Sequence, residues 1–444
     1  MHLTNSDKAR LSGSIKVVRE PNRPDVAAQS DPKVIATVSE MLSNIEARGL
    51  NAVREYAERL DGWEGGPDFQ ITPARADKLT ADLPQDLRES LEAGAERTQT
   101  FAKMQRSRLT DFEDEVIPGV VCGQKFVPIG TVGAYLPAGR FPLLASAFMT
   151  VGVAKAAGVP NIVSCTPPSN NGQVHPAVLY SARISGAENI FALGGVQALA
   201  AMAFGLLDAA PPADMIVGAG NAFVAEAKRQ LYGTVGIDVL AGPSEVAVIA
   251  DATASATMVA ADLLAQAEHG PTSPACLVTT SARLAEEVEI EIQRQLAGLA
   301  TREIAGAAWR DWGSIYVADS QATAVEVMDT LAPEHLEILT ADPDYYLNNL
   351  RNYGSLFLGE WSTVAYADKG MSGTNHVLPT GRGARFTEGL SVSRFLKQLT
   401  YQRATEASTV AQATPVVTIS EFEQMPAHRD SAQLRLNLLA RQNA

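Results

Sequence analysis

The sequence has few cysteines and no long apolar run. Its three cysteines, Cys122, Cys165 and Cys276, are odd in number and far apart, which argues against a disulfide framework and a cysteine zinc cluster. No apolar run reaches the roughly 18 residues of a membrane helix, and the first thirty residues lack a signal-peptide core. We therefore expect a cytoplasmic protein with reduced, mostly buried thiols, in which any metal has nitrogen and oxygen ligands.

Positive charge is also scarce. The 36 Lys and Arg residues face 50 Asp and Glu residues, so the formal net charge is −14. An exposed polyanion would be repelled over most of such a surface, and we expect neither a nucleic-acid nor a membrane partner. With 444 residues, 46% of them hydrophobic, the chain is long enough for two or more domains.

The two ends of the chain differ from its middle. Residues 1–32 contain REPNRPDVAAQSDP, a polar stretch broken by prolines, which predicts an extended arm outside any core. From Val34 to Leu60 the apolar residues recur at helical spacing, and TPARADKLTADLPQDLRESLEAGAERTQTFAKM predicts two more helices. After Phe386 the pattern is polar and helical again, in SVSRFLKQLTYQ and in EFEQMPAHRDSAQLRLNLLARQ.

Beyond Val116, short β-rich runs alternate with helical ones. The β-rich runs are NIVSCTPP, NIFALGG, ADMIVGAG, SEVAVIAD, ACLVTTS, SIYVAD, LEILTAD and SLFLG. This alternation predicts an α/β fold with two doubly wound, incomplete Rossmann-like parallel-sheet domains and helical N- and C-terminal segments. We assign residues 33–127 plus 245–385 to the first domain, 128–244 to the second, and 386–444 to a C-terminal helical dimerisation segment, with the crossing at VLAGPSEV.

Two glycine-rich turns could hold a phosphate. In VGAGNAFVAEAKR, Gly218 and Gly220 precede a helix, as in a dinucleotide fingerprint, and Asp238 falls near the expected acidic position. Phe223 stands where that fingerprint has a third small residue, so a tight turn without a ligand is the alternative. ALGGVQALAAMAFG presents the same two options.

The six histidines include four in unusual contexts. In AQAEHGP, Gln266 and His269 are three residues apart at the end of a predicted helix, where they share one face. Imidazole, Asp and Glu suit Zn²⁺, whereas an amide is an uncommon ligand. The alternative is a hydrogen-bonded structural histidine. The remaining histidines are His335, His376 and His428, beside Glu, Asn or Asp, and His2 and His175, which we place on the surface.

Glu334 and His335 follow Pro333 in LAPEHLE. Adjacent side chains leave the chain in different directions, so this pair is better suited to act as two separate proton acceptors than to chelate one ion. The alternative is a glutamate that stabilises the start of a helix, with the histidine packed beneath it.

Taken together, AQAEHGP, LAPEHLE, YADKGMSGTNHVLPT, MPAHRD, VGAGNAFVAEAKRQ and AGPSEVAVIAD resemble the histidinol dehydrogenase family. The similarity runs from roughly Val34 to Leu439. It implies oxidation of a primary alcohol to a carboxylate in two NAD-dependent steps through a bound aldehyde. It also implies a domain-swapped homodimer, in which the C-terminal segment completes the partner's site.

The resemblance assigns roles residue by residue. The implied zinc ligands are Gln266, His269, Asp368 and His428. The implied catalytic residues are His335, which takes the alcohol proton, and Glu334, which activates the water that attacks the aldehyde. The implied NAD contacts are Tyr135, Gln197 and Asn221, and the implied substrate contacts are Ser244, His376 and Glu423.

The sequence departs from the biosynthetic members of the family in the loop YLPAGRFPLLASAFM, where Arg140 replaces a small residue and Ala145 a serine. Ala219 replaces a proline, and DKGMSGTNH is one residue longer. These features resemble the sulfopropanediol 3-dehydrogenase branch, which oxidises (R)-2,3-dihydroxypropane-1-sulfonate to sulfolactate. Arg140 could bind the sulfonate, or pair with a surface acid. Glu423 favours the alternative substrate, the amine L-histidinol. A non-catalytic binding protein on the same scaffold is a third reading.

Overall fold

The computed structural model describes residues 1–22, 31–64, 68–139, 141–168, 173–208, 210–240 and 242–442. The chain forms two compact units. Unit 1 comprises Met1–Arg106 and Ile129–Phe395, and unit 2 comprises Ser107–Pro128 and Leu396–Ala444. Among the described residues, no helix combines the length and the apolar character that crossing a membrane requires.

Unit 1 contains a six-stranded sheet. Its order is β1 (Ile15–Arg19), β11 (Gly313–Ala318), β10 (Ala275–Thr279), β9 (Val246–Ala250), β12 (His335–Leu339) and β13 (Ser355–Leu358). All neighbours pair in parallel except β1, which is antiparallel to β11. The helices that follow these strands are α10 (Ala256–Ala267), α11 (Ala282–Gly298), α12 (Arg302–Trp312), α13 (Gln321–Leu331), α14 (Pro343–Asn349) and α15 (Val364–Asp368).

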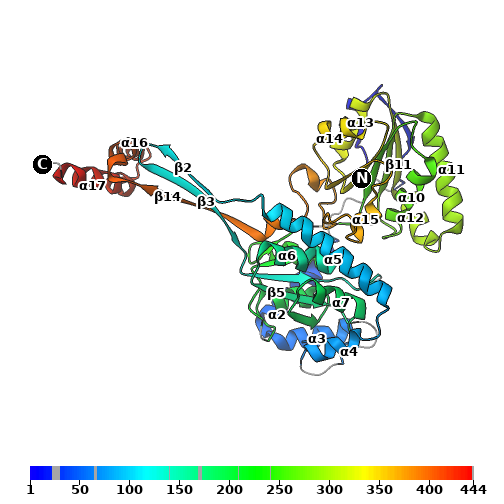
Figure 1. The fold of residues 1–444 in the computed structure, drawn as a ribbon, viewed down its shortest axis with the longest axis horizontal. Coiled ribbons are helices and arrows are strands. Elements are labelled where there is room, and N and C mark those ends of the chain that lie inside the picture. Colours follow the sequence, from blue (N-terminus) through cyan, green and yellow to red (C-terminus); the bar gives the residue numbers. More distant parts are fainter. Residues whose placement is uncertain are drawn as a thin grey trace. The chain divides into compact units, whose positions relative to one another are not determined.

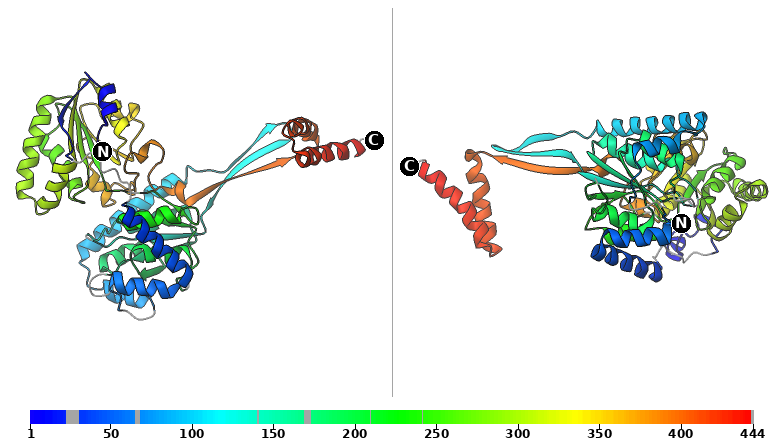
Figure 2. Two further views of the ribbon diagram at one scale, coloured as in Figure 1. Left: turned by 180° about the vertical axis from the view of Figure 1, so that it is seen from behind. Right: turned by 90° about the horizontal axis from the view of Figure 1, so that it is seen from below.

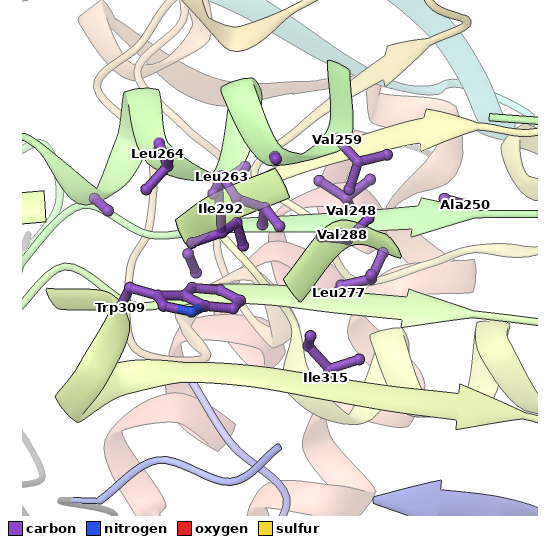
Figure 3. Close-up of a cluster of buried hydrophobic side chains, with 14 of the residues drawn as sticks. Val248, Ala250, Val259, Leu263, Leu264, Leu277, Val288, Ile292, Trp309 and Ile315 are labelled. Atoms are coloured by element: carbon purple, nitrogen blue, oxygen red, sulfur yellow. The ribbon is translucent and has the colours of Figure 1, made fainter. Parts of the chain in front are cut away.

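Helices cover both faces of this sheet, which explains its continuous apolar strands. All five residues of β9 are buried. Val248 packs in a cluster with residues of α10, α11 and α12, while Ile249 packs in a second cluster with residues of α13. Figure 3 shows the first cluster, in which Val259 and Leu263 of α10 lie over the sheet. Successive side chains of a strand point to opposite faces, so each strand anchors both layers.

The second sheet of unit 1 has the order β6 (Asn189–Ala192), β5 (Asn161–Thr166), β4 (Thr131–Tyr135), β7 (Met215–Val217) and β8 (Gly236–Ile237), all parallel. The chain enters at β4 and winds first to one side and then to the other. The carboxyl ends of β4 and β7 therefore form the topological switch point at which open α/β sheets bind ligands. Its helices are α6 (Val153–Ala157), preceded by a π-helical turn at Phe148–Gly152, α7 (Pro176–Ile184), α8 (Gly195–Ala203) and α9 (Ala222–Leu231).

The predicted α/β class, the two parallel sheets and the eight β-rich runs are confirmed. The helices predicted near the N-terminus are also present, as α2 (Pro32–Arg48), α3 (Leu50–Asp61), α4 (Pro73–Thr80) and α5 (Gln85–Arg106). Their assignment to the first domain is wrong. α2 packs on α8 and α9, α4 on α7, and α5 on α6, so all these contacts are with helices of the second sheet.

The prediction that the N-terminal residues form an extended arm outside any core is wrong up to Arg19. α1 (Asn5–Arg10) and β1 belong to the first sheet and its core, because Leu3 and Leu11 are buried in the cluster that contains Ile249. β1 adds to the edge of the sheet beside β11. Residues 23–30 of the predicted arm lie outside the described residues.

Unit 2 is an antiparallel ribbon followed by two helices, as Figures 1 and 2 show. Its strands are β2 (Phe112–Ile117), β3 (Val120–Pro128) and β14 (Leu396–Ala404), with β3 in the middle, and its helices are α16 (Thr409–Phe422) and α17 (Pro426–Gln442). The helix predicted in SVSRFLKQLTYQ is wrong from Leu396 to Gln402, which belong to β14. β14 pairs with β3 along nine residues, and this distant partner overrides the local helical pattern.

Candidate active site

Two helices of unit 1 carry or precede three of the four predicted zinc ligands, and two of these side chains face each other. Gln266 lies in the last turn of α10 and is buried, and His269 lies two residues beyond the end of that helix. Asp368 is the last residue of α15, and its Oδ2 lies 3.4 Å from Nε2 of His269. The packing of α15 on α10 therefore places a carboxylate opposite an imidazole.

The separation of these two atoms suits a shared metal ion. Two ligands bound at about 2.1 Å to a tetrahedral zinc ion lie about 3.4 Å apart. The Nε2 atom of Gln266 is buried without a hydrogen-bond partner in the described part of the chain, so this donor is open to an acceptor, while a metal ion would be held by the amide oxygen Oε1. Across those same residues no three His, Cys, Asp or Glu side chains form a metal cluster by themselves, so an amide and a fourth ligand would have to complete the set.

The charges around Asp368 keep it ionised. Burial alone would raise its pKa, but the hydrogen bond with His269 and the nearby His376 and His335 hold the pKa well below its usual range. His376, a predicted substrate contact, donates from Nδ1 to the backbone oxygen of Asp368 at 3.2 Å. Burial lowers the pKa of His376 and favours its neutral form.

His335 is the first residue of β12, and its ring is held in one orientation. Its Nδ1 lies 3.0 Å from the backbone oxygen of Glu245. A carbonyl oxygen only accepts, so Nδ1 carries the hydrogen and the lone pair of the neutral ring is on Nε2. That Nε2 is buried, has no hydrogen-bond partner among the described residues, and lies 4.0 Å from Oδ1 of Asp368. The basic nitrogen of His335 thus faces the predicted metal ligands.

Glu334 lies on the other side of the same imidazole. Its Oε2 accepts a hydrogen bond from the backbone nitrogen of Glu245 at 2.8 Å and lies 3.4 Å from Nδ1 of His335. Any side chain at position 354 would place its Cβ 2.4 Å from the backbone oxygen of Glu334, so only glycine fits there. The alternative of a helix start at Glu334 is wrong, because the chain enters strand β12.

Glu245 is a site residue that the sequence did not reveal. It follows Ser244, a predicted substrate contact, and its Oε1 accepts from the backbone nitrogen of Gly381 at 3.2 Å. Burial and the neighbouring Glu334 raise the pKa of Glu245 to about 7. For His335, burial favours the neutral ring, but the charges of Glu334 and Asp368 outweigh it and raise its pKa to about 9.

The predicted cofactor residues lie around the second sheet. The hydroxyl of Tyr135, at the end of β4, accepts from the backbone nitrogen of Gly195 at 3.2 Å. Gln197 is buried and donates from Nε2 to Oδ2 of Asp61 at 2.9 Å, and the same oxygen accepts from Gly194. The carboxylate of Asp61, another residue that the sequence did not reveal, therefore lies at the amino end of α8 and holds the predicted cofactor residue Gln197 and the backbone of Gly194.

The glycine turn after β7 is built for close approach. Gly218 has a φ of +115°, and a Cβ there would lie 2.2 Å from the backbone oxygen of Tyr135, so glycine is required at the switch point. Asn221, the third predicted cofactor residue, accepts from Phe223 and Val224 at the start of α9.

Asp238 is not free to act as the acidic residue of a dinucleotide fingerprint. It is buried, it pairs with Lys228, and its Oδ2 accepts from the backbone nitrogen of Gly218 at 2.7 Å. Lys228 also donates to the backbone oxygens of Gly218 and Val239. The buried pair therefore shapes the glycine turn itself.

The other predicted residues are distributed as follows. Arg140 lies outside the described residues, while Ala145 is buried beside the π-helical turn. His428, in α17, and Glu423, at the end of α16, belong to unit 2 and are exposed.

With this geometry established, comparison with known proteins decides the family. A sequence model of the family described as "Histidinol dehydrogenase" matches residues 25–436. The chain belongs to the histidinol dehydrogenase family. Its crystallised relatives include histidinol dehydrogenase from Elizabethkingia anophelis, which superposes with a TM-score of 0.88 at 33% identity and covers 94% of this chain and 95% of its own.

Relatives in this family carry more than one name. A histidinol dehydrogenase homolog of Shouchella clausii is 46% identical, over 92% of this chain and 95% of its own. The sulfopropanediol 3-dehydrogenase of Ruegeria pomeroyi is 43% identical, over 93% and 95%. The histidinol dehydrogenase of Methanosarcina mazei is 41% identical, over 90% and 91%. The chain is thus an oxidoreductase of the dehydrogenase type, and relatives with different names have similar identities to it.

Proposed function

We propose that this protein oxidises a primary alcohol to a carboxylate in two NAD-linked steps through an enzyme-bound aldehyde, with one zinc ion in each site. The observation that carries the proposal is the buried Nε2 of His335. This atom is the lone-pair nitrogen of a ring fixed by Glu245, and it faces Asp368 beside His269. A proton acceptor next to a metal-ligand set is what alcohol oxidation requires.

In the first step His335 accepts the hydroxyl proton of the alcohol while the hydride leaves for NAD⁺. The ring must be neutral to do so, and its pKa of about 9 is raised largely by the carboxylates around it. Neutralising the charge of Asp368 would lower that pKa and favour the free base. When bound to Gln266, His269, Asp368 and His428, zinc supplies a Lewis acid that holds and polarises the substrate oxygen.

In the second step Glu334 takes a proton from the water that adds to the aldehyde, and the hydrate then gives up its hydride. Oε2 of Glu334 is held by the backbone nitrogen of Glu245, so the carboxylate keeps its orientation between the two steps. Ser244 and His376 lie directly beside this machinery and would contact the substrate. Tyr135, Gln197 and Asn221 would bind NAD at the second sheet.

For the substrate we propose a short hydroxy-sulfonate, (R)-2,3-dihydroxypropane-1-sulfonate, which would yield sulfolactate. Support comes from Ala145 in place of a substrate-contacting serine, from Arg140 as a partner for a sulfonate, and from the Ruegeria pomeroyi relative. L-Histidinol is the second candidate, because the Glu423 carboxylate suits an amine and the Methanosarcina mazei relative bears that name.

We further propose that the working unit is a homodimer in which unit 2 of one chain completes the site of the other. The helices of unit 2 bury little of their own apolar surface: Phe422 is 88% exposed and Leu434 is 57% exposed. Apolar surface of this extent indicates an interface. His428 and Glu423 lie on the same two helices.

The test is NADH formation by the zinc-loaded protein, with L-histidinol and both enantiomers of dihydroxypropane sulfonate assayed in parallel. Two NADH per molecule of one sulfonate enantiomer, with histidinol inert, is the expected result. Turnover of histidinol alone would mean that L-histidinol is the substrate, and the proposed two-step oxidation would still hold. A chain that reduces NAD⁺ with none of the three, although it holds zinc stoichiometrically, would contradict both substrate assignments.

A further inference from the structure

A buried and a half-buried acidic side chain lie on two of the elements that carry the candidate site. Glu337, in the middle of β12, is completely buried, and Asp262 lies in α10 at the edge of the same core. The two carboxyl groups bind adjacent residues at the start of α15: Oε1 of Glu337 accepts from the backbone nitrogen of Val364, and Oδ1 of Asp262 accepts from the hydroxyl of Thr363. Two neighbouring carboxyl groups can share a hydrogen bond only when one of them keeps its proton, because two carboxylates have no donor between them.

Glu337 is the member that keeps the proton. Its Oε1 accepts from the backbone nitrogen of Val364 at 2.7 Å, and its Oε2 has no N–H or O–H donor within the described part of the chain. Oε2 is therefore the oxygen that is free to donate to Asp262 when Glu337 is protonated. Burial and the neighbouring Asp262 raise the pKa of Glu337 to about 8, in agreement with this assignment.

The pair connects the three elements that carry the site. On β12, His335 and Glu337 are two residues apart and point to the same face. On α10, Asp262 precedes Gln266 by four residues, so these two share one side of the helix, and His269 lies in the turn that follows its end. On α15, Val364 is the first residue and Asp368 the last, and Thr363, the N-cap, donates from Oγ1 to Oδ1 of Asp262 at 3.0 Å.

Hydrogen bonding to the pair thus fixes the start of a helix that is only five residues long. Oε1 of Glu337 holds the backbone nitrogen of Val364, and Asp262 holds the hydroxyl of Thr363, which in turn accepts from Ala365. A helix this short has no stability of its own, so its orientation depends on these contacts and on the packing of Val364 and Ala367.

We propose that the Asp262–Glu337 pair is a positioning device that locks α10 and α15 onto β12, so that Gln266, His269 and Asp368 stand ready before a metal ion binds. Asp262 and Glu337 touch neither substrate nor metal in this scheme. They act through the two helices. The link to zinc rests on the proposed function, whereas the locking of α15 does not.

The experiment measures two properties of the purified full-length chain. One is hydrogen–deuterium exchange of the α15 amides in metal-free protein, and the other is zinc affinity by competition with a chelator. Glu337→Met removes the pair at nearly constant volume. Glu337→Gln keeps both bonds, because its amide donates to Asp262 and its carbonyl accepts from Val364. Ile338→Ala is the matched control: it lies next in β12 but packs in the cluster on the opposite face.

We expect Glu337→Met to speed exchange in α15 and to raise the zinc dissociation constant about 10–100-fold, as for other groups that orient metal ligands. Glu337→Gln should stay near wild type in both. Ile338→Ala should lower the thermal midpoint and change neither. Should Glu337→Met fail to fold, Thr363→Val, which removes the hydroxyl bonded to Asp262, must give the same two changes.

The proposal would be overturned if Glu337→Met kept the wild-type hydrogen–deuterium exchange rates in α15 and the wild-type zinc affinity. A loss in Glu337→Gln as large as in Glu337→Met, or equal changes in Ile338→Ala, would also overturn it. If the wild-type chain binds no zinc, the proposed metal is wrong, and the exchange rates of metal-free protein still decide whether the pair locks α15.

Discussion

Glu334 and His335 are neighbours in the chain, but their surroundings suit them to different steps. Changing Glu334 to Gln keeps an oxygen for the backbone nitrogen of Glu245 and removes the base. We expect aldehyde oxidation to fall about 10²–10⁴-fold and alcohol oxidation much less. Single-turnover NADH formation, started from the alcohol and from the aldehyde, measures both steps. Equal losses would show that the two residues do not divide the work as proposed.

His269 is a half-buried member of the predicted ligand set, and measuring bound metal tests its role. Its Nε2 lies 3.4 Å from Oδ2 of Asp368. His269→Ala therefore removes one predicted ligand and leaves the Asp368 carboxylate without its neighbouring imidazole. We expect loss of bound zinc and loss of turnover in the purified variant, as determined by metal analysis and NADH assay. His175→Ala is the control, since that residue precedes α7 beside the other sheet. Full zinc occupancy in His269→Ala would remove His269 from the set.

At the scale of single residues, the chemistry of the side chains was predictable and their surroundings were not. The spacing of Gln266 and His269 predicts a shared helix face, but α10 ends at Ala267 and His269 lies in the turn beyond it. Glu245 gave no such signal, because it acts on Glu334 and His335 through backbone atoms and across a sheet. Asp61 was missed for the same reason: the residues that it holds, Gly194 and Gln197, are far away in the sequence.

The connection between β12, α10 and α15 gives the protein a pH dependence. The ordinary pKa of a glutamate is 4.5, and that of Glu337 is raised to about 8 in the folded chain. Burial of Asp262 raises its pKa as well. The folded state therefore holds the shared proton more tightly than the unfolded state, and this contribution to stability is complete below pH 4.5 and is lost as the pH rises towards 8.

Glu337→Gln has no proton to lose at this position. Between roughly pH 5 and pH 9 its thermal midpoint should fall less than that of the wild type, because only the wild type acquires two adjacent carboxylates. Thermal unfolding of both proteins across this range measures the difference. Parallel curves would mean that Glu337 does not titrate in the folded chain.

In the second sheet, the turn between β7 and α9 depends on the buried pair Lys228 and Asp238. Removing the ammonium by Lys228→Met leaves a buried carboxylate unpaired, which should lower the free energy of unfolding by about 3–5 kcal/mol. The double variant Lys228→Met with Asp238→Asn should recover much of this loss. Urea unfolding compares them, and a stable single variant would contradict the ion-pair interpretation. The sequence suggested a ligand role for Asp238, since spacing does not reveal a partner ten residues away.

At the scale of the whole molecule, local sequence patterns predicted most helices and strands. They failed for elements whose partners are far away in the sequence. Eight strands of the two sheets were predictable, because buried parallel strands are continuous apolar runs, whereas β1, β4 and β8 were not predicted. β14 was not, because its partner β3 precedes it by more than 260 residues and its side chains are mostly exposed. The packing of α2 on α8 and α9 is another long-range contact, so the domain assignment of the N-terminal helices was wrong.

The exchange of unit 2 between chains can be tested by mixing inactive subunits. His269 lies in unit 1 and His428 in unit 2. If His428 of the partner subunit completes each site, a mixed dimer of His269→Ala and His428→Ala chains contains one intact site and one doubly damaged site. Random reassociation of equal amounts should then restore about a quarter of wild-type activity. If each chain uses its own His428, both sites of the mixed dimer are damaged and mixing restores nothing. Light scattering of each variant must first show dimers, and a monomeric, fully active wild type would refute the exchange.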